Sequence, residues 1–362
     1  MNMSLNNSLD SKKAGLAATV YEIDPRGDVR WREFIVAHPE SSIFHTPEWL
    51  EALSRTYGYD PVVLTTARPG EPISDGVACC RINSWLTGSR IVSLPFSDHC
   101  QPLTDPGKAS EALFSSMRAK VVGGNARYCE IRPRSLATTE TELPLGESET
   151  CCFHWLDLRP SPEEIYKRFH YSCIQRKIRR GEREALTISE GRSEAHVKMF
   201  YDLMLLTRRR HQLPPQPLQW FRNLVACLGN AMLIRVSFKG EQPIAAVVTL
   251  AWQKTVVLKY VCSDARFHNL GAIQSLIWHV IRDAKENGAS ELDFGRSDSD
   301  NEGLINFKDS WGCQRSILTY YRYPTKRNPP RSQQAKSLAR VFAMLPDSWL
   351  TTAGRMLYRH IG

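Results

Sequence analysis

The chain has 362 residues, of which 42% are hydrophobic, 23% charged and 9% aromatic. This composition is typical of globular proteins and excludes disordered, collagen-like and low-complexity chains. At roughly 150 residues per domain, the length predicts two domains. The net charge of +9 favours a nucleic-acid partner only weakly, because it is concentrated in two places. The segment 324–362 carries +6, and the segment 161–184 carries +3.

Cysteine spacing and hydropathy narrow the class of protein further. None of the ten cysteines forms a Cys-x-x-Cys pair, which argues against zinc-ribbon and thioredoxin-type sites. No apolar segment is long enough for a membrane span, and the apolar run 14–20 is short for a secretory signal. We therefore expect a cytoplasmic protein with reduced thiols, no metal, and a disordered N-terminus over residues 1–19.

The first half of the chain predicts a helix, three strands joined by short turns, a second helix and a fourth strand. The first helix is capped by Thr46 and opened by Pro47, a favourable start. A Pro-Gly-Glu-Pro turn at 69–72 separates the first two strands. In chain order, these elements cover 47–55, 61–67, 73–82, 90–94, 108–120 and 128–131.

The second half repeats this order after a helical stretch of its own. A capping box at 161–164 opens a helix to about residue 183, and two more helices follow over 196–211 and 218–228. Three strands, a helix and a fourth strand then cover 231–238, 244–252, 255–262, 272–286 and 291–294. The shared order of elements, about 170 residues apart, predicts an internal duplication.

Two sets of motifs resemble known families. Arg266-x-x-Asn269-x-Gly271 resembles the pyrophosphate loop of the GNAT acyltransferases, (Gln/Arg)-x-x-Gly-x-(Gly/Ala), with asparagine at the first glycine position. The run Gly-Leu-x-x-Phe-Lys-x-x-Trp-Gly at 303–312 is similar to the closing motif of the Fem family of aminoacyltransferases. The runs 44–49 and 94–99 resemble the first domain of a Fem-like branch associated with exopolysaccharide or envelope-glycan synthesis.

The resemblance, which covers about residues 20–323, implies an α+β fold of two tandem GNAT-like domains with mixed, mainly antiparallel sheets flanked by helices. We place the first domain at 20–149, the second, on the acyl-donor side, at 150–323, and a basic amphipathic helical tail at 324–362.

The implied function is N-acyl transfer to an amino group of a cell-envelope glycan or peptidoglycan-type precursor, by direct attack on an activated donor. Acyl-CoA is the favoured donor and aminoacyl-tRNA the alternative. A non-catalytic assembly factor that binds a glycan intermediate for exopolysaccharide synthesis is the rival interpretation.

Candidate catalytic residues lie on and after the strand 255–262. Asp264 and His268 flank the loop, where a histidine is suited to taking a proton from an amine. Lys259 and Tyr260 stand near the end of the strand, and a tyrosine hydroxyl there is suited to protonating a leaving thiolate. By the resemblance, the donor would be bound by Arg266, Asn269, Leu270 and Gly271. The alternatives are a helix-capping histidine and a half-buried core tyrosine.

Candidate acceptor-binding residues come from both halves of the chain. Arg296 follows the strand 291–294, at the carboxyl end where open sheets bind ligands. Asp98 and His99 occupy the matching end of the first copy, so both sets are expected to face a cleft between the domains. Asn301 and Lys308, which lie in and beside the closing motif, complete the set. For Lys308, a solvated surface position is the alternative.

Two basic segments remain. In the tail, apolar residues recur at helical spacing, so it either packs on the body or makes peripheral contact, through residues 331–361, with the inner face of a membrane. The cluster 167–183 is either a solvated helix face or a phosphate-binding surface. It lacks interleaved aromatic residues, so nucleic acid is not expected as a partner except for transfer RNA. The apolar tail residues are Leu338, Val341, Phe342, Leu345, Trp349, Leu350, Ala353, Met356 and Leu357.

Overall fold

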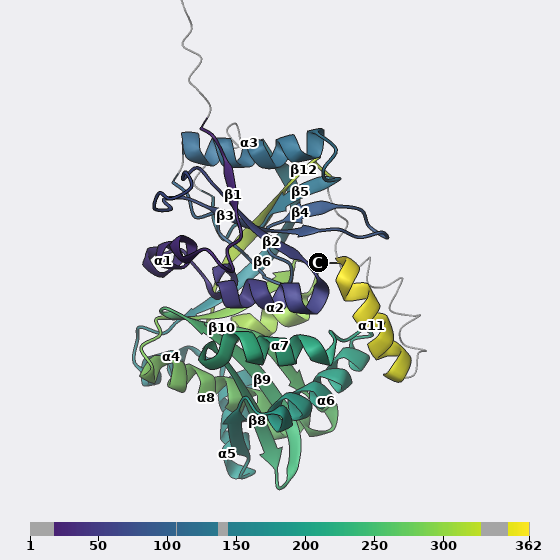
Figure 1. Cartoon of the computed structure of the whole chain (residues 1–362). Coiled ribbons are helices and arrows are strands. Elements are labelled where there is room, and N and C mark those ends of the chain that lie inside the picture. The colour runs from purple at the N-terminus through teal and green to yellow at the C-terminus, as the bar shows by residue number, and fades with distance from the viewer. Residues whose placement is uncertain (1–17, 106, 137–143, 327–346, 362) are drawn as a thin grey trace, which may run out of the picture.

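The computed structural model describes residues 18–105, 107–136, 144–326 and 347–361. Their strands form one twelve-stranded sheet in the order β1-β2-β3-β4-β5-β12-β6-β11-β10-β9-β8-β7 (Figure 1). The strands are β1 (Tyr21–Ile23), β2 (Asp60–Thr65), β3 (Val77–Ile82), β4 (Arg90–Val92), β5 (Tyr128–Ile131), β6 (Gly146–Asp157), β7 (Thr187–Gly191), β8 (Met232–Lys239), β9 (Gln242–Trp252), β10 (Thr255–Ser263), β11 (Glu291–Asp298) and β12 (Gln314–Tyr323).

The helices lie between these strands and cover the sheet (Figure 1). The α-helices are α1 (Val29–Ala37), α2 (Pro47–Tyr57), α3 (Lys108–Val122), α4 (Pro162–Arg168), α5 (Arg176–Arg183), α6 (Glu194–Arg210), α7 (Leu218–Leu228), α8 (Ala272–Glu286), α9 (Glu302–Asp309) and α11 (Asp347–Ile361). Short helical turns are η1 (Ile43–His45), η2 (Tyr171–Gln175), η3 (Gly229–Ala231) and η4 (Ala265–Leu270).

The predicted duplication is confirmed by the sheet topology. In the first repeat, β2, β3 and β4 are antiparallel neighbours, and β5 returns parallel to β4 after α3. In the second repeat, β8, β9 and β10 are antiparallel neighbours, and β11 returns parallel to β10 after α8. The repeat also extends toward the N-terminus: β1 with α1 and α2 corresponds to β7 with α6 and α7.

Two strands cross between the repeats and join them into one sheet. β6 directly follows the first repeat in sequence but pairs antiparallel with β11 of the second repeat. β12 follows the second repeat but pairs through Tyr321–Tyr323 with β5 of the first repeat. β6 and β12 pair with each other along most of their length. The predicted boundary at 149/150 therefore falls inside β6, a strand shared by both halves of the sheet.

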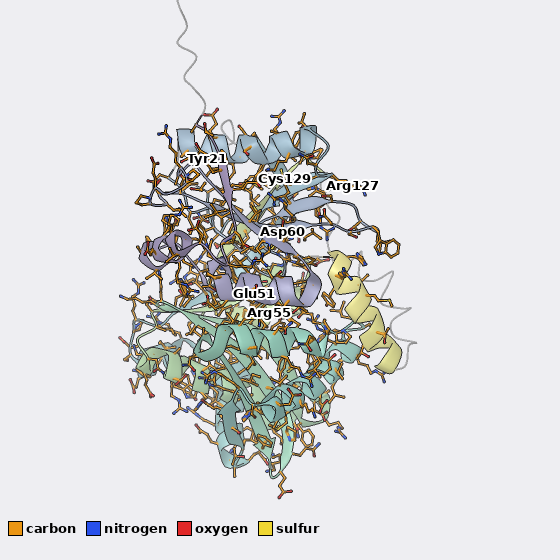
Figure 2. All side chains as sticks on the ribbon, in the orientation of Figure 1. Tyr21, Glu51, Arg55, Asp60, Arg127 and Cys129 are labelled. Carbon is orange, nitrogen blue, oxygen red and sulfur yellow. The ribbon has the colours of Figure 1, made fainter. Side chains whose placement is uncertain are left out.

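The core continues across the junction of the repeats. α2 and α7 lie against each other there (Figure 1), and the indole rings of Trp49 and Trp220 meet edge to face, 5.3 Å apart. Both rings are fully buried. On the outer side of α2, Glu51 and Arg55 form an ion pair one turn apart, at 2.7 Å (Figure 2). α2 thus follows its amphipathic pattern, with its apolar face contributing to a core shared by both repeats.

Two predicted elements need correction. The helix predicted over 161–183 is interrupted, because the N–H of His170 donates to the carbonyl of Ser310 at 2.8 Å and the chain continues as the π-helical turn η2. The strand predicted from residue 73 begins only at Val77. The Asp75 carboxylate accepts hydrogen bonds from the N–H of Thr66, at 2.8 Å, and from the Thr66 hydroxyl. The segment 66–75 is therefore closed into a loop and does not extend the strand.

The described part of the tail is a helix, α11, that packs on the body. The carbonyl of His360 accepts hydrogen bonds from Arg90 Nη2 at 2.8 Å and from the Thr87 hydroxyl at 3.0 Å. The carbonyl of Tyr358 accepts a hydrogen bond from the Tyr59 hydroxyl at 2.7 Å. The hydroxyl of Tyr358 donates to the Pro214 carbonyl at 3.2 Å. α11 therefore contacts both repeats. The predicted apolar positions 338–345 and the N-terminal residues 1–17 lie outside the described residues.

Removing α11 by deleting residues 347–362 should destabilise the protein. The deletion removes the hydrogen bonds that Arg90 and Thr87 donate to the His360 carbonyl and that Tyr59 donates to the Tyr358 carbonyl, each worth about 0.5–1.5 kcal/mol of unfolding free energy. Thermal unfolding followed by circular dichroism would measure this. Met356→Ser, at a side chain that is 66% exposed, is the matched control and should leave the melting temperature unchanged. An unchanged melting temperature in the deletion variant would contradict a structural role for α11.

Candidate active site at the junction of the repeats

The centre of the second repeat contains an opening in the sheet. β10 and β11 pair in parallel only from Thr255–Val257 to Glu291–Asp293, although both strands continue further. Each strand carries a register irregularity just beyond this pairing, between Leu258 and Tyr260 in β10 and between Asp293 and Gly295 in β11. Because both bulges fall at the same level, the two strands separate there. Side chains from other elements enter at this point.

The corresponding place in the first repeat is closed. After β4, the N–H of Ser93 donates to the carbonyl of Glu130 at 2.8 Å, and Cys100 donates to Arg132 at 2.6 Å. The loop between these two bonds bulges outward, with positive φ angles of 43° at Leu94 and 61° at Phe96. Such angles are uncommon for side chains other than glycine, asparagine and aspartate. This loop carries Asp98 and His99 across to the opening of the second repeat.

Contacts with β11 and β12 hold the loop in place. The hydroxyl of Tyr320 donates to the carbonyl of Asp98 at 2.5 Å. The imidazole of His99 is 3.0 Å from the carboxylate of Asp293, and both side chains are buried. The second oxygen of Asp293 accepts the N–H of Gly295 at 2.6 Å. A buried carboxylate of the second repeat thus fixes a histidine of the first.

Cations surround the Asp98 carboxylate. Lys259 Nζ lies 3.8 Å from one of its oxygens, and Arg296 and Lys308 also act on it. Burial alone would raise the pKa of Asp98, but Lys259, Arg296 and Lys308 together outweigh burial and lower it. The Asp98 side chain is 28% exposed, so this carboxylate is charged and partly open to solvent.

The two lysines are held differently. Lys308, expected either at the site or in solvent, is buried, and its Nζ donates to the carbonyls of Gly295 and Arg296, both at 2.8 Å. Burial lowers its pKa, an effect that Asp98 partly offsets. Lys259 Nζ lies over the rings of Phe44 and Trp49, 5.1 and 5.9 Å from their centres. These contacts place both ammonium groups at the opening.

Tyr260 lies next to Lys259 on β10. Its hydroxyl accepts the indole N–H of Trp220 at 2.9 Å. Burial raises the pKa of this phenol, and the bond from Trp220 offsets the effect only in part. Tyr260 therefore keeps its proton at neutral pH and has it available for donation.

Asp264 and His268 have other partners in the loop after β10. Asp264 caps η4: it accepts the N–H of Arg266 and forms an ion pair with its guanidinium at 2.6 Å, which lowers the pKa of Asp264. His268 Nε2 is 2.9 Å from the Ser263 hydroxyl and 3.4 Å from Arg210 Nη1. Burial, with Arg210 and Lys177 nearby, lowers the pKa of His268. No hydrogen bond or ion pair recorded for the described residues joins either side chain to Asp98.

The predicted phosphate loop fits a phosphate only in part. Gly271 has a φ of +78° and caps α8, and a Cβ atom there would lie 2.1 Å from the carbonyl oxygen of Lys177 in α5. The backbone is therefore tightly covered at this residue, and Leu270 is buried. Arg266 and Asn269 are exposed, with 73% of the Arg266 side chain accessible. The loop thus offers a cationic side chain to a phosphate but little open backbone.

The remaining candidates, Arg296 and Asn301, serve the structure locally. β11 does not end at residue 294, as predicted, but continues past its bulge to Asp298, so Arg296 lies within the strand. Its guanidinium pairs with Glu149 at 2.9 Å and contacts the Tyr320 hydroxyl at 3.3 Å. Asn301 caps α9 by accepting the N–H of Leu304 at 3.2 Å. Arg296 thereby links β6, β11 and β12 beneath Asp98.

Sequence reasoning missed Asp293, Glu149 and Tyr320. Asp293 alternates with the buried Leu292 and Phe294 in a short strand, a pattern that predicts a solvent-facing position. It is instead buried, because His99 on the loop of the first repeat contacts its carboxylate. No local pattern marks the other two, whose roles arise from the exchange of β6 and β12.

Residues 169–309 match a family model described as an acetyltransferase (GNAT) domain. This segment is thus similar to GNAT acetyltransferase domains. It contains Lys259, Tyr260, Asp293 and Lys308, whereas Asp98 and His99 come from outside it. A comparison with curated proteins finds no sequence that matches the chain. Among the described residues, no group of histidine, cysteine and acidic side chains has the arrangement of a metal site.

Solved structures share the fold of the whole chain. FemX is similar with a TM-score of 0.66 and 14% identity, over 82% of this chain and 95% of FemX. A tandem GNAT protein from the clavulanic acid biosynthesis pathway has a TM-score of 0.51 and 10% identity, over 84% and 98% of the two chains. L-PGS from Bacillus licheniformis has a TM-score of 0.51 and 13% identity, over 83% and 98%. The α+β fold of two tandem GNAT-like repeats, expected from the sequence, is confirmed.

Gly295→Ala should destabilise the protein and displace Asp98. Gly295 has a φ of +71°, and a Cβ atom there would lie 2.4 Å from an Asp98 carboxylate oxygen. Gly70→Ala is the matched control, because Gly70 has a φ of +87° with no atom within 4 Å of a Cβ. The backbone strain of about 1–2 kcal/mol is common to both variants. Chemical denaturation should show a larger loss for Gly295→Ala, and equal losses would contradict the close approach of Asp98.

Proposed function

We propose that this protein is an N-acyltransferase that transfers an acyl group from an activated donor directly to an acceptor amine. One observation carries the proposal. Within the GNAT domain, β10 and β11 separate, and at the opening Lys259 and Lys308 meet a carboxylate supplied by the other repeat. The reaction needs charge stabilisation and positioning in one place, and the junction of the repeats provides both.

The chemistry follows from the charges at the opening. The amine attacks the acyl carbonyl, the new C–N bond forms, and negative charge develops on the carbonyl oxygen. The ammonium groups of Lys259 and Lys308 stabilise that charge. The ionised Asp98 orients the amine and accepts a hydrogen bond from it. The bond between the acyl carbon and the leaving group then breaks, and the phenol of Tyr260 protonates the departing atom. The excess amine proton passes to solvent, and solvent returns a proton to the Tyr260 phenolate, so the site is restored.

The favoured donor is acyl-CoA. A GNAT domain implies an activated acyl donor of this kind, and the cationic Arg266 and Lys177 are exposed near the loop that leads into α8. Aminoacyl-tRNA is the alternative donor. It is supported by the exposed basic face of α5, which would contact a phosphate backbone. This face consists of Arg176, Lys177, Arg179, Arg180 and Arg183.

For the acceptor, we propose an amino group on a cell-envelope glycan or peptidoglycan-type precursor, free or lipid-linked. The support is the resemblance of the closing motif at 303–312 to the Fem family, together with the fold shared with FemX. The motif contributes Lys308 directly to the opening.

A second candidate function is favoured by the phosphate loop. The carbonyl of Lys177 covers Gly271, and Asn269 replaces the first glycine of the motif. A chain in which this loop accepts no donor would act as a non-catalytic assembly factor that binds a glycan intermediate for exopolysaccharide synthesis. Donor binding separates the two functions.

Calorimetric titration with acetyl-CoA and with aminoacyl-tRNA tests donor binding. Turnover is then followed by the release of free CoA or free tRNA in the presence of amino-sugar and amino-acid acceptors. Lys308→Met and Lys259→Met should each lower turnover about 100-fold or more, because each removes a cation that stabilises the developing charge. Lys254→Met, an exposed lysine at the opposite end of β10, is the control and should retain full turnover. Binding of neither donor, or full turnover in both site variants, would refute catalysis.

We also propose peripheral contact with the cytoplasmic face of a membrane, through the tail. No helix of the described ranges has the length and hydropathy of a membrane span. Trp85 and Leu86, at the tip of the β3–β4 hairpin, are 87% and 56% exposed, and the Trp85 ring meets the His360 ring of α11 at 5.5 Å. The exposed Met356 and Arg359 lie on the same helix. Exposed apolar groups beside basic ones suit an anionic membrane surface.

Vesicle flotation of the full-length protein tests this contact. Binding to vesicles that contain phosphatidylglycerol should exceed binding to pure phosphatidylcholine, and Trp85→Ser should weaken it several-fold, because an interfacial tryptophan is removed. Val122→Ser, a 69% exposed residue on α3, is the control. Membrane contact would be contradicted if the same fraction of protein floated with both kinds of vesicle, or if Trp85→Ser bound the vesicles as strongly as the parent chain.

A further inference from the structure

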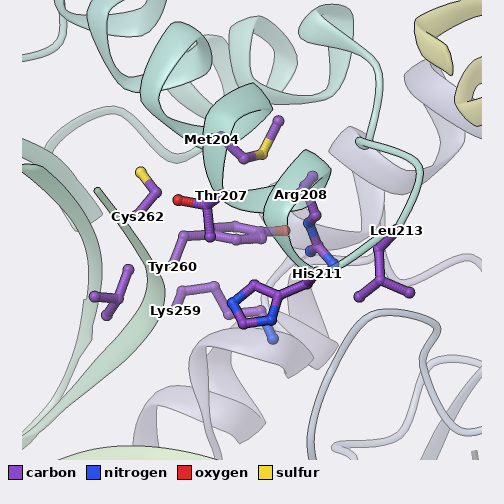
Figure 3. A pocket seen from close by; sticks show the side chains of 9 residues that line it. Met204, Thr207, Arg208, His211, Leu213, Lys259, Tyr260 and Cys262 are labelled. Atoms are coloured by element: carbon purple, nitrogen blue, oxygen red, sulfur yellow. The ribbon is translucent and has the colours of Figure 1, made fainter. Parts of the chain in front are cut away.

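A pocket of about 270 Å³ lies beside β10, between the end of α6 and the loop that follows it (Figure 3). Lys259 and Tyr260 form one wall, which joins the pocket to the opening where Asp98 lies. Leu213 closes the opposite side, and Met204 and Thr207 come from α6. The other lining residues are Arg208, His211, Val261 and Cys262.

The pocket is cationic and its lining contains no acidic residue. Arg208 is half-buried, and its guanidinium has no hydrogen-bond or ion-pair partner recorded among the described residues. Its neighbour Arg210, by contrast, donates to the carbonyl of Ser263 at 3.2 Å. Lys259 pairs with the carboxylate of Asp98, on which Arg296 and Lys308 also act. A partly desolvated guanidinium without a counter-charge is costly, so the pocket favours an anion.

Two further groups face Arg208. The Tyr260 hydroxyl points toward it, and His211 lies beside it at the mouth of the pocket (Figure 3). Partial burial, with Arg210 and Arg208, lowers the pKa of His211. The other side chains of the lining include the apolar Met204, Leu213 and Val261. The pocket therefore combines several hydrogen-bond donors with apolar walls.

We propose that this pocket binds a small carboxylate group carried by one of the two substrates, with Arg208 as its fork-shaped partner. The proposal rests on the proposed acyl transfer and names a substrate class for it: an acceptor or acyl group with a carboxylate close to the reacting centre. Guanidinium and carboxylate match in planar, two-bond geometry. The volume of about 270 Å³ is enough for an amino-acid-sized group.

The tail helps to shape this pocket. Leu213 is followed by Pro214 and Pro215, and the Tyr358 hydroxyl of α11 donates to the Pro214 carbonyl at 3.2 Å. Gly354 lies so close to the Pro215 carbonyl that a Cβ atom there would be 2.1 Å away. α11 thus holds the loop that closes the pocket opposite β10.

Binding to the full-length protein can be measured by calorimetry with two isosteric probes. N-acetyl-L-alanine carries the carboxylate, and N-acetyl-L-alaninamide replaces it with a neutral amide. The acid should bind at least about tenfold more tightly than the amide, and Arg208→Gln should remove most of this difference, because a charge-assisted hydrogen-bond pair is lost. Arg68→Gln, an exposed arginine in the turn between β2 and β3, removes the same charge elsewhere and should bind both probes like the parent chain.

A second pair of probes identifies the source of the carboxylate. If the acyl group carries it, Arg208→Gln should weaken binding of succinyl-CoA but not of acetyl-CoA. If the acceptor carries it, both thioesters should bind Arg208→Gln like the parent. Four results would each overturn the carboxylate site. The first two are equal affinity for the acid and the amide, and no saturable binding of either probe. The others are tighter binding of inorganic phosphate than of the acid, and an Arg208→Gln variant that still binds the acid more tightly than the amide. Acid binding without any acyl transfer would instead leave the site intact and refute the proposed reaction.

Discussion

The two repeats exchange one strand each: the strand that follows each repeat in sequence pairs with a strand of the other repeat. β6 leaves the first repeat to pair with β11, and β12 leaves the second repeat to pair with β5. Because β6 and β12 also pair with each other, twelve strands form one hydrogen-bonded surface. Neither repeat has its full set of strand partners alone. The backbone hydrogen bonds of the exchanged strands therefore fix how the two repeats are placed relative to each other.

This fixed geometry places charged groups where neither repeat would place them alone. The loop after β4 reaches the opening between β10 and β11, where Asp98 meets Lys259 and His99 meets Asp293. Burying these groups is tolerable because each has partners of opposite charge or hydrogen-bond donors at contact distance. Gly295 is required there because the carboxylate of Asp98 occupies the space that a side chain would need.

The two repeats have diverged in what they do with the same topology. In the first, backbone hydrogen bonds from Ser93 and Cys100 keep the loop attached to β5 and its sheet closed. In the second, bulges at Lys259 and Phe294 open the sheet. One repeat therefore supplies the opening, and the other supplies groups that face it.

Local sequence patterns were sufficient for the elements and their order. The capping residues Thr46 and Ser161, the turn glycines and the period of apolar residues determine helices and strands within a few neighbours, so the duplication was visible in the sequence. Lys259, Asp98, His99 and Lys308 were also singled out, from position and resemblance. The contacts of Asp293, Glu149 and Tyr320 were decided only by the tertiary structure. Their partners lie on strands or loops far away in sequence, brought together by the exchange of β6 and β12, and no local pattern encodes such contacts. The surroundings of Arg208 likewise depend on β10 and on the loop that α11 holds.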